Sequence, residues 1–394
     1  MKQTWRWFGP QDKVTLSDVR QTGASGIVTA LHDIRPGDLW TREAIAARRT
    51  EIEAAGLTWE VVESLPVSEA IRTGAPEAEA HIAAWIASME HLAAEGIEVI
   101  CYNFMPVNDW TRTDLAAPMD SGAKALRFDL VDFAAFDVHV LGRDAATRDY
   151  SNSVLAAAAE RAEAMNEEER ERLTATILAG LPGSAEHWTM DSFRARLETY
   201  ADIDAERLRR NLATFLGAVA PNAERLGMRL CCHPDDPPWP LFGLPRIMST
   251  EADFQWLVDV VPSPANGITF CTGSLGARGD NDLPGMMQRL GHKVHFLHLR
   301  NVRRADDNVP CSFHEDEHLA GSTDMVAVMR AIVAEERRRR AEGRADASIP
   351  MRPDHGQEIL DDRTRKAAPG YPAIGRLKGL AELRGVMMAL EHEA

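Results

Sequence analysis

The sequence predicts a (β/α)8 TIM barrel with a largely helical insertion after the fourth strand. Three observations support this class: eight short β-type runs, helical patterns between them, and one interval that is too long for a single helix. The expected strands cover 4–8, 26–31, 58–64, 97–103, 228–233, 267–271, 294–299 and 349–353. We expect residues 1–394 to form one barrel domain.

The helical segments between these strands follow the apolar periodicity. The clearest is 76–95, where Ile82, Trp85 and Met89 recur at helical spacing and Gly96 follows the end. Further helices are expected near 42–55, 203–219, 251–260, 323–340 and 373–390.

Segment 109–200 interrupts the alternation and is predicted to be an insertion. It contains a possible strand pair at 124–141 and a charged helix at 153–178. A lid or an oligomer contact is the favoured interpretation, although loops on this face of a barrel often supply site residues.

Composition excludes several functions. The net charge of -16 argues against nucleic acid as a partner. No apolar run approaches the length of a membrane span, and the start lacks the apolar region of a signal peptide. The odd number of cysteines shows no disulfide-like spacing, so we expect a reduced, cytoplasmic protein.

Potential metal ligands stand at the ends of the four last strands, where barrel enzymes place their catalytic groups. The ends carry two imidazoles, one thiol and one carboxylate, namely His233, Cys271, His298 and Asp354. Each alone is more often structural, but together they predict a shell for a divalent metal. Cys232 is an alternative to Cys271, although strand alternation gives Cys231, not Cys232, the parity of His233.

Strand alternation also selects two arginines. Arg300 shares the strand face of His298, and Arg352 shares that of Asp354. Guanidinium groups beside a metal suit a small anionic, oxygen-rich substrate. The alternative, which we weigh equally, is that they neutralise Asp235, Asp236 or Asp354.

The chain resembles the D-mannonate dehydratase family of the hexuronate-degradation route. The resemblance covers the chain from end to end, in the blocks WRWFGP, GIVTALHDI, VESLPV, CYNFMPVNDWTRTDL, CCHPDDPPWP, FCTGSLG, HFLHLRN, FHEDEHL, MRPDHG and PGYPAIGRLKGLAELRG. It implies a TIM barrel related to xylose isomerase. The implied reaction removes water from D-mannonate to give 2-keto-3-deoxy-D-gluconate with a divalent metal, usually Mn²⁺ or Fe²⁺. The ligands implied by the resemblance are the same four strand-end residues.

The resemblance also implies functional roles for His355 and Tyr371, which become the acid and base candidates in either order. Histidine titrates near neutrality, and a tyrosine close to a cation loses its proton more easily. Arg300 or Arg352 would then clamp the substrate carboxylate, and Asn103 and Asn301 would bind its hydroxyl groups.

Supporting roles are expected for polar residues that flank these groups. His314, Glu315 and His318 form a cluster with an indirect role at best, and Asp235 or Asp236 is expected to accept the second ring N–H of a ligand histidine. We expect a homo-oligomer. Rival interpretations are a sugar isomerase, a metal-dependent nuclease and a non-catalytic sensor of sugar acids.

Overall fold

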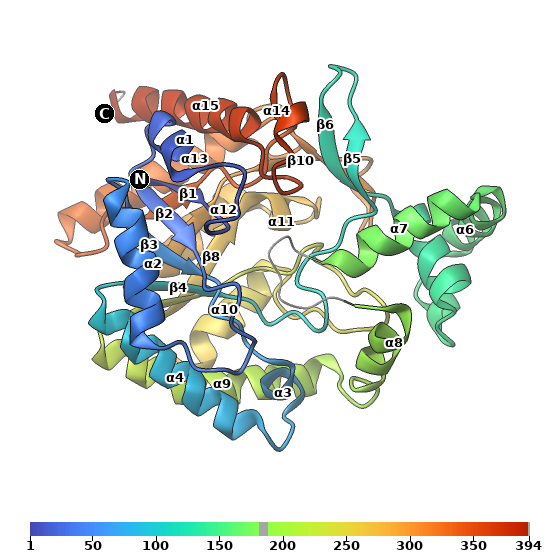
Figure 1. Cartoon of the computed structure of the whole chain (residues 1–394), viewed down its shortest axis with the longest axis horizontal. Coiled ribbons are helices and arrows are strands. Elements are labelled where there is room, and N and C mark those ends of the chain that lie inside the picture. Colours follow the sequence, from blue (N-terminus) through green and yellow to red (C-terminus); the bar gives the residue numbers. More distant parts are fainter. Residues whose placement is uncertain (181–187, 393–394) are drawn as a thin grey trace.

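In a computed structural model, which describes residues 1–180 and 188–392, eight parallel strands close into the predicted barrel. The predicted fold class is confirmed (Figure 1). Around the barrel the strands follow chain order: β1 (Lys2–Arg6), β2 (Gly26–Thr29), β3 (Thr58–Glu63), β4 (Val99–Tyr102), β7 (Arg229–Cys232), β8 (Asn266–Cys271), β9 (Val294–His298) and β12 (Pro350–Arg352). Because all are parallel, their carboxyl ends meet at one mouth.

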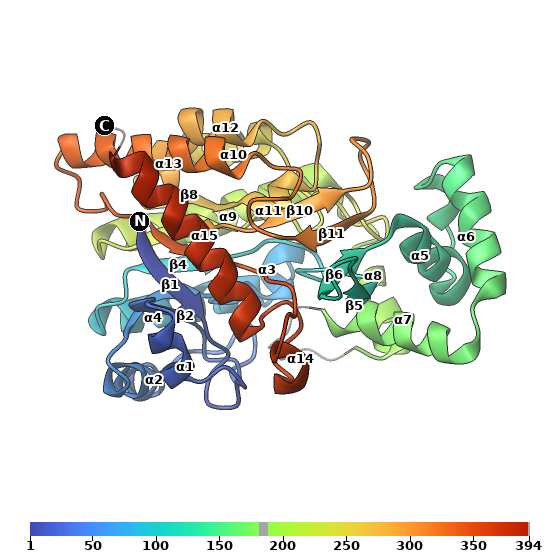
Figure 2. The same cartoon turned by 90° about the horizontal axis from the view of Figure 1, so that it is seen from above.

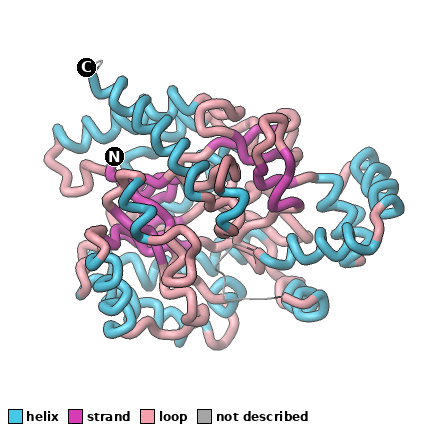
Figure 3. The backbone as a smooth tube through the Cα atoms, turned by 45° about the horizontal axis from the view of Figure 1, so that its top comes forward, coloured by secondary structure: helices cyan, strands magenta, loops and turns pink. Residues whose placement is uncertain are grey.

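Helices surround the barrel, as the tube in Figure 3 shows. The longer ones are α2 (Arg42–Ala54), α4 (Ala78–Ala94), α9 (Ala205–Arg225), α10 (Glu251–Val260), α12 (Leu283–Leu290), α13 (Met325–Ala341) and α15 (Ala373–His392). The shorter ones are α1 (Leu16–Gln21), α3 (Glu69–Thr73), α11 (Thr272–Gly276) and α14 (Asp362–Arg365), with the single turn η3 (Gly291–Lys293). Starts follow capping rules: Asp204 caps α9, and Thr250 forms a capping box with Asp253 at α10.

The barrel interior and the helix layer form separate apolar clusters. Inside the barrel, valines of successive strands pack with cysteines and a phenylalanine: Val28, Val61, Val99, Cys101, Cys231 and Phe296. A larger cluster lies between the strands and the surrounding helices. The barrel interior is therefore a packed apolar core, and the polar groups lie at the mouth formed by the carboxyl ends of the strands. None of the described helices combines the length and apolar character needed to span a bilayer.

A second, antiparallel sheet lies beside the barrel, and the sequence reasoning did not foresee it. Its order is β10 (Asn301–Arg304), β11 (Phe313–Asp316), β6 (Lys124–Phe128) and β5 (Asp114–Pro118). The predicted strand pair at 124–141 is wrong, because the hairpin covers 114–128. Asp129 ends the strand by capping α5 (Leu130–Ala135), and helical spacing then buries Phe133 and Phe136.

The predicted helix at 153–178 is two helices, α6 (Asn152–Ala164) and α7 (Glu167–Ala179). Asn166 breaks it, because this residue caps α7 in a capping box with Glu169. With η1 (Phe136–Leu141) and η2 (Ala146–Arg148), these helices project to one side of the barrel in Figures 1 and 2. The insertion also contains α8 (Met190–Glu198); its residues 181–187 lie outside the described part.

Candidate metal centre and acid–base pair

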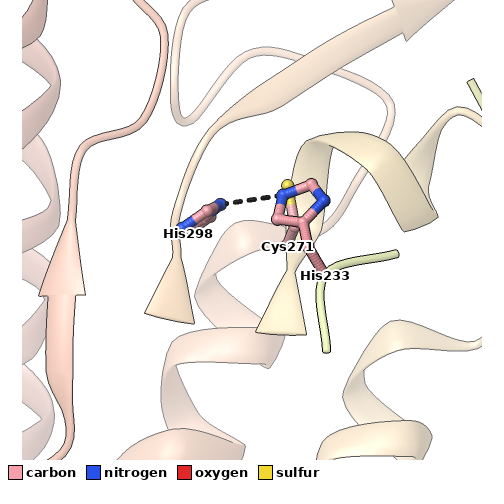
Figure 4. Close-up of side chains that lie close together, drawn as sticks. All are labelled: His233, Cys271 and His298. Atoms are coloured by element: carbon pink, nitrogen blue, oxygen red, sulfur yellow. Dashed lines mark hydrogen bonds between the residues drawn. The ribbon is translucent and has the colours of Figure 1, made fainter. Parts of the chain in front are cut away.

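Three predicted ligands meet at the mouth of the barrel (Figure 4). His233 directly follows β7, Cys271 ends β8 and His298 ends β9. One nitrogen or sulfur atom of each lies within 4.8 Å of the other two, and His233 Nε2 is 3.0 Å from His298 Nδ1.

The fourth predicted ligand, Asp354, lies beside these three. One carboxylate oxygen is 3.7 Å from Cys271 Sγ and 3.9 Å from His298 Nδ1. Asp354 follows β12, so four successive strands of the barrel each bring one donor to the same place. Two imidazoles, a thiolate and a carboxylate are a donor set that suits a divalent transition metal.

Polar contacts orient both histidines toward the shared point. His233 Nδ1 lies 2.7 Å from the carbonyl oxygen of Pro234, so it carries the proton and leaves the Nε2 lone pair free. His298 Nε2 lies 3.4 Å from a carboxylate oxygen of Glu63, which leaves Nδ1 facing His233. The expectation that Asp235 or Asp236 would accept a hydrogen bond from a ligand histidine is therefore wrong.

Those two aspartates have other partners. Asp235 accepts hydrogen bonds from the backbone of Met248 and the hydroxyl of Ser249. Asp236 pairs with Arg112 and Arg300.

The sulfur of Cys271 is poised as a thiolate. Burial raises the pKa of this thiol, but the charge of Arg300 and the adjacent imidazoles of His233 and His298 outweigh burial, so the pKa lies well below its usual range. Ser274 adds donors from its hydroxyl and its backbone N–H, at 3.2 and 3.4 Å. Thiolates, not thiols, bind metals.

The charges around the site also fit a cation. Among the described residues, five anionic groups face four guanidinium groups: Glu63, Asp236, Cys271, Glu315 and Asp354 against Arg6, Arg112, Arg300 and Arg352. Burial lowers the pKa of His233, but the contact with Cys271 outweighs burial and raises the pKa to about 10, so the surroundings of this imidazole favour positive charge.

Arg300 and Arg352 are paired with protein carboxylates. Arg300 binds Asp236 and Glu315, and its Nε is 2.7 Å from Asp354. Arg352 binds Glu63 through Nε and Nη2, at 3.0 and 2.8 Å, and also Asp354. The structure therefore favours the neutralising alternative for both arginines. Glycine is required at position 273, since a Cβ there would lie 2.4 Å from the Arg300 side chain.

His355 and Tyr371 form one hydrogen-bonded unit with a third residue, Glu315. The Nε2 of His355 is 3.2 Å from the Tyr371 hydroxyl, and its Nδ1 is 3.0 Å from a carboxylate oxygen of Glu315. Burial raises the pKa of Tyr371 even though Arg352 lowers it, so the phenol is protonated at neutral pH. The nearby cation Arg352 eases proton loss from this tyrosine as expected, but burial has the larger effect on the pKa.

The two predicted asparagines differ in position. Asn103 borders the cavity that lies over the metal-ligand cluster. Its Nδ2 donates to Asp109 and its Oδ1 accepts from Arg72. Asn301 is fully buried elsewhere: its Nδ2 donates to the carbonyls of His318 and Thr323. The structure thus does not bring Asn301 to the cavity, and its side chain holds the connection that follows β11.

Sequence reasoning missed several residues of this site. Glu63 ends β3, so the strand-end argument would have found it if applied to the early strands. Glu315 was assigned only an indirect role, because its strand and its sheet were not foreseen. Arg112 binds both Asp236 and Glu315 from inside the insertion, which no local pattern indicates.

These groups line one cavity over the metal-ligand cluster. Its walls come from separate segments of the chain, and they include Glu63, Asn103, Asp109, Trp110, His233, Asp236, Arg300, Arg352, Asp354, His355 and Tyr371. The start of the insertion therefore contributes side chains to the site. The fold and the cavity define the class: a TIM-barrel enzyme with a candidate metal site and an acid–base pair at the carboxyl ends of its strands.

Comparison with known proteins identifies the family within this class. The model of the D-mannonate dehydratase (UxuA) family matches residues 1–394, and the chain belongs to this family. It is 57% identical over 392 residues to mannonate dehydratase 1 of Agrobacterium fabrum, covering 100% of this chain and 98% of that one. Identity to the mannonate dehydratase of Chromohalobacter salexigens is 55% over 394 residues, with both chains covered completely.

Solved structures agree with the fold. The mannonate dehydratase of Streptococcus suis serotype 2 has a TM-score of 0.77 and 32% identity, covering 100% of this chain and 94% of that one. A xylose isomerase domain protein from Planctomyces limnophilus has a TM-score of 0.50 at 9% identity, covering 99% and 97%. The second likeness concerns the fold alone.

Proposed function

We propose that this protein dehydrates D-mannonate to 2-keto-3-deoxy-D-gluconate and water, a step of hexuronate catabolism, with the help of a divalent metal. The observation that carries this proposal is the convergence of His233, Cys271, His298 and Asp354 beside the hydrogen-bonded pair His355 and Tyr371. The family indicates the substrate, and the described residues supply candidate metal ligands, a proton donor and a proton acceptor.

We propose Mn²⁺ as the metal, with Fe²⁺ as an alternative. The thiolate and the imidazoles by themselves favour softer ions, while manganese prefers oxygen donors, so the family resemblance decides the order. When bound, such an ion acts as a Lewis acid on substrate oxygen atoms and offsets negative charge that develops at the carboxylate.

The acid and base roles follow from the hydrogen bonds of His355. Its Nδ1 faces the carboxylate of Glu315, so the proton resides there and the Nε2 lone pair can accept a proton from C2. The protonated hydroxyl of Tyr371 can give its proton to the departing C3 hydroxyl. The C2–H and C3–O bonds break, a C2–C3 double bond forms, and the enol rearranges to the 2-keto acid.

The same contacts allow the two side chains to recover. After the elimination, His355 carries an extra proton and Tyr371 lacks one, and their reacting atoms are 3.2 Å apart. Transfer between them restores the starting state. Burial raises the pKa of Glu315, but the charge of Arg300 outweighs burial and lowers the pKa to about 2. The carboxylate is therefore ionised, and it stabilises the imidazolium until the proton has moved to Tyr371.

A direct assay tests the proposal. The purified protein is incubated with Mn²⁺ or Fe²⁺ and D-mannonate, and 2-keto acid is measured over time. We expect steady product formation that a chelator abolishes and either metal restores. D-gluconate, which differs at C2, serves as the stereochemical control. No product from D-mannonate with either metal would refute the proposal.

A further inference from the structure

A second pocket adjoins the cavity above the metal-ligand cluster, and we call it the distal pocket. It shares Ser64, Asn103 and Asp109 with that cavity. Further polar walls come from β1, the loop after β2 and α3: Arg6, His32, Glu69 and Arg72. Because these three residues line both spaces, the two pockets lie side by side, within reach of one small molecule.

Several hydrogen-bonding atoms of the distal pocket lack a partner within the described residues. They are Nε of Arg6, Nε2 of His32 and Nε of Arg72, and all are buried. Nη1 of Arg6 also makes no hydrogen bond, although it has an ion-pair contact with Glu63. Buried donors without a partner are costly, about 1–3 kcal/mol each, and such groups usually satisfy a ligand or water. Arg6 itself is only 4% exposed, so few alternatives are open to it.

The charges of the distal pocket suit neutral groups better than a second anion. Arg6 Nη1 lies 3.3 Å from a Glu63 oxygen, and Arg72 is paired with Glu69. Burial and the nearby charges of Arg6 and Arg48 lower the pKa of His32 to about 3, so its imidazole is neutral. Donors whose charge is already balanced match hydroxyl oxygens.

A six-carbon acid needs such a place. Under the proposed function, C1 to C3 react beside Asp354, His355 and Tyr371, and the remaining carbons carry three hydroxyl groups that must leave the reaction cavity. We propose that the distal pocket binds this polyol end, with Arg6 and His32 donating hydrogen bonds to its terminal hydroxyl groups. The two residues thereby select substrates by chain length. This inference rests on the proposed function.

The test removes a hydrogen-bond donor from the enzyme by substitution, or the terminal hydroxyl group from the substrate by shortening it. The kcat/KM is measured for D-mannonate and for the five-carbon acid with the same configuration at C2, C3 and C4. The variants are His32→Phe, which keeps a ring without donors, and Arg6→Lys, which keeps the charge beside Glu63 but loses the guanidinium fork. His292→Phe, an exposed histidine in the turn before β9, is the control for the substitution itself.

We expect wild type and control to prefer the longer acid by up to about 100-fold, the value of two hydrogen bonds of about tenfold each. In His32→Phe and Arg6→Lys, kcat/KM should fall by about tenfold for D-mannonate but by less than about threefold for the shorter acid. Equal losses on both substrates would overturn the inference while the proposed function stands. A wild type that leaves D-mannonate unchanged would refute both, and this outcome is visible before any variant is made.

Discussion

His233 and His298 present ring nitrogens to each other at 3.0 Å, although 65 residues separate them in sequence. Both outward nitrogens are held, one by the carbonyl of Pro234 and the other near Glu63. Two lone pairs at this distance repel unless a cation or a proton lies between them. The thiolate of Cys271 and the carboxylate of Asp354 lie beside the two rings, and their negative charges further favour a cation at this point.

Removing one ligand should remove the metal. Cys271→Ala and His298→Ala are each expected to lower metal content from roughly one equivalent to a small fraction, together with activity. Elemental analysis of the purified variants measures this, and circular dichroism checks the fold. Cys311→Ala is the matched control, because that cysteine is buried near the carbonyl of Ala277. A Cys271 variant with full metal content would disprove the ligand role.

Tyr371→Phe should separate metal binding from proton transfer. We expect metal content to stay unchanged and kcat to fall by about 100-fold or more, since the phenol is the proposed acid. Steady-state kinetics measure the loss. Tyr150→Phe provides the control, because its hydroxyl binds Asp137 inside the insertion. Wild-type turnover in Tyr371→Phe would exclude the hydroxyl from the reaction.

Glu315 is a positioning residue for His355, and its charge has a kinetic consequence. In Glu315→Gln the hydrogen bond to Nδ1 can persist, but the imidazolium loses its counter-charge, so kcat should fall by about tenfold with little change in KM. Glu315→Asp should recover part of the loss. If both variants had the same kcat as wild type, the carboxylate would have no part in proton transfer.

Acid stability is expected to depend on an ion-pair network far from the site. Asp346 binds Arg344 and Arg339, and these charges outweigh burial and lower its pKa to about 2. The contribution of Asp346 to folding stability is complete above pH ~4, which is the pKa of this group in the unfolded chain. It is lost as the pH falls through ~2. Asp346→Asn should therefore cost about 1 kcal/mol at pH 7, less at pH 2, with activity unchanged.

Urea unfolding of wild type and Asp346→Asn at both pH values measures this difference. A penalty that is the same at pH 7 and pH 2 would show that the charge of Asp346 contributes nothing.

The sequence predicted the barrel strands well because each is a short apolar run bounded by turns, and runs such as 26–31 and 267–271 match β2 and β8 closely. The strand-end argument brought the four donors together because parallel strands share one mouth. It could not show that Arg300 and Arg352 are already neutralised, since Asp236, Glu315 and Glu63 arrive from other segments.

The insertion was predicted less accurately for a local reason. A run such as 130–136 is apolar enough for either a strand or a helix, and the cap formed by Asp129 decides for the helix. The second sheet joins β6 to β11, almost two hundred residues away, and no local pattern records such a pairing.

The most direct test of the account is a crystal structure of the Mn²⁺-loaded protein with anomalous data collected at the manganese edge. We predict a single strong anomalous peak within about 2.0–2.4 Å of His233 Nε2, Cys271 Sγ, His298 Nδ1 and a carboxylate oxygen of Asp354. A peak elsewhere, or fully loaded protein with none at this cluster, would contradict the claim that these four side chains bind one metal ion.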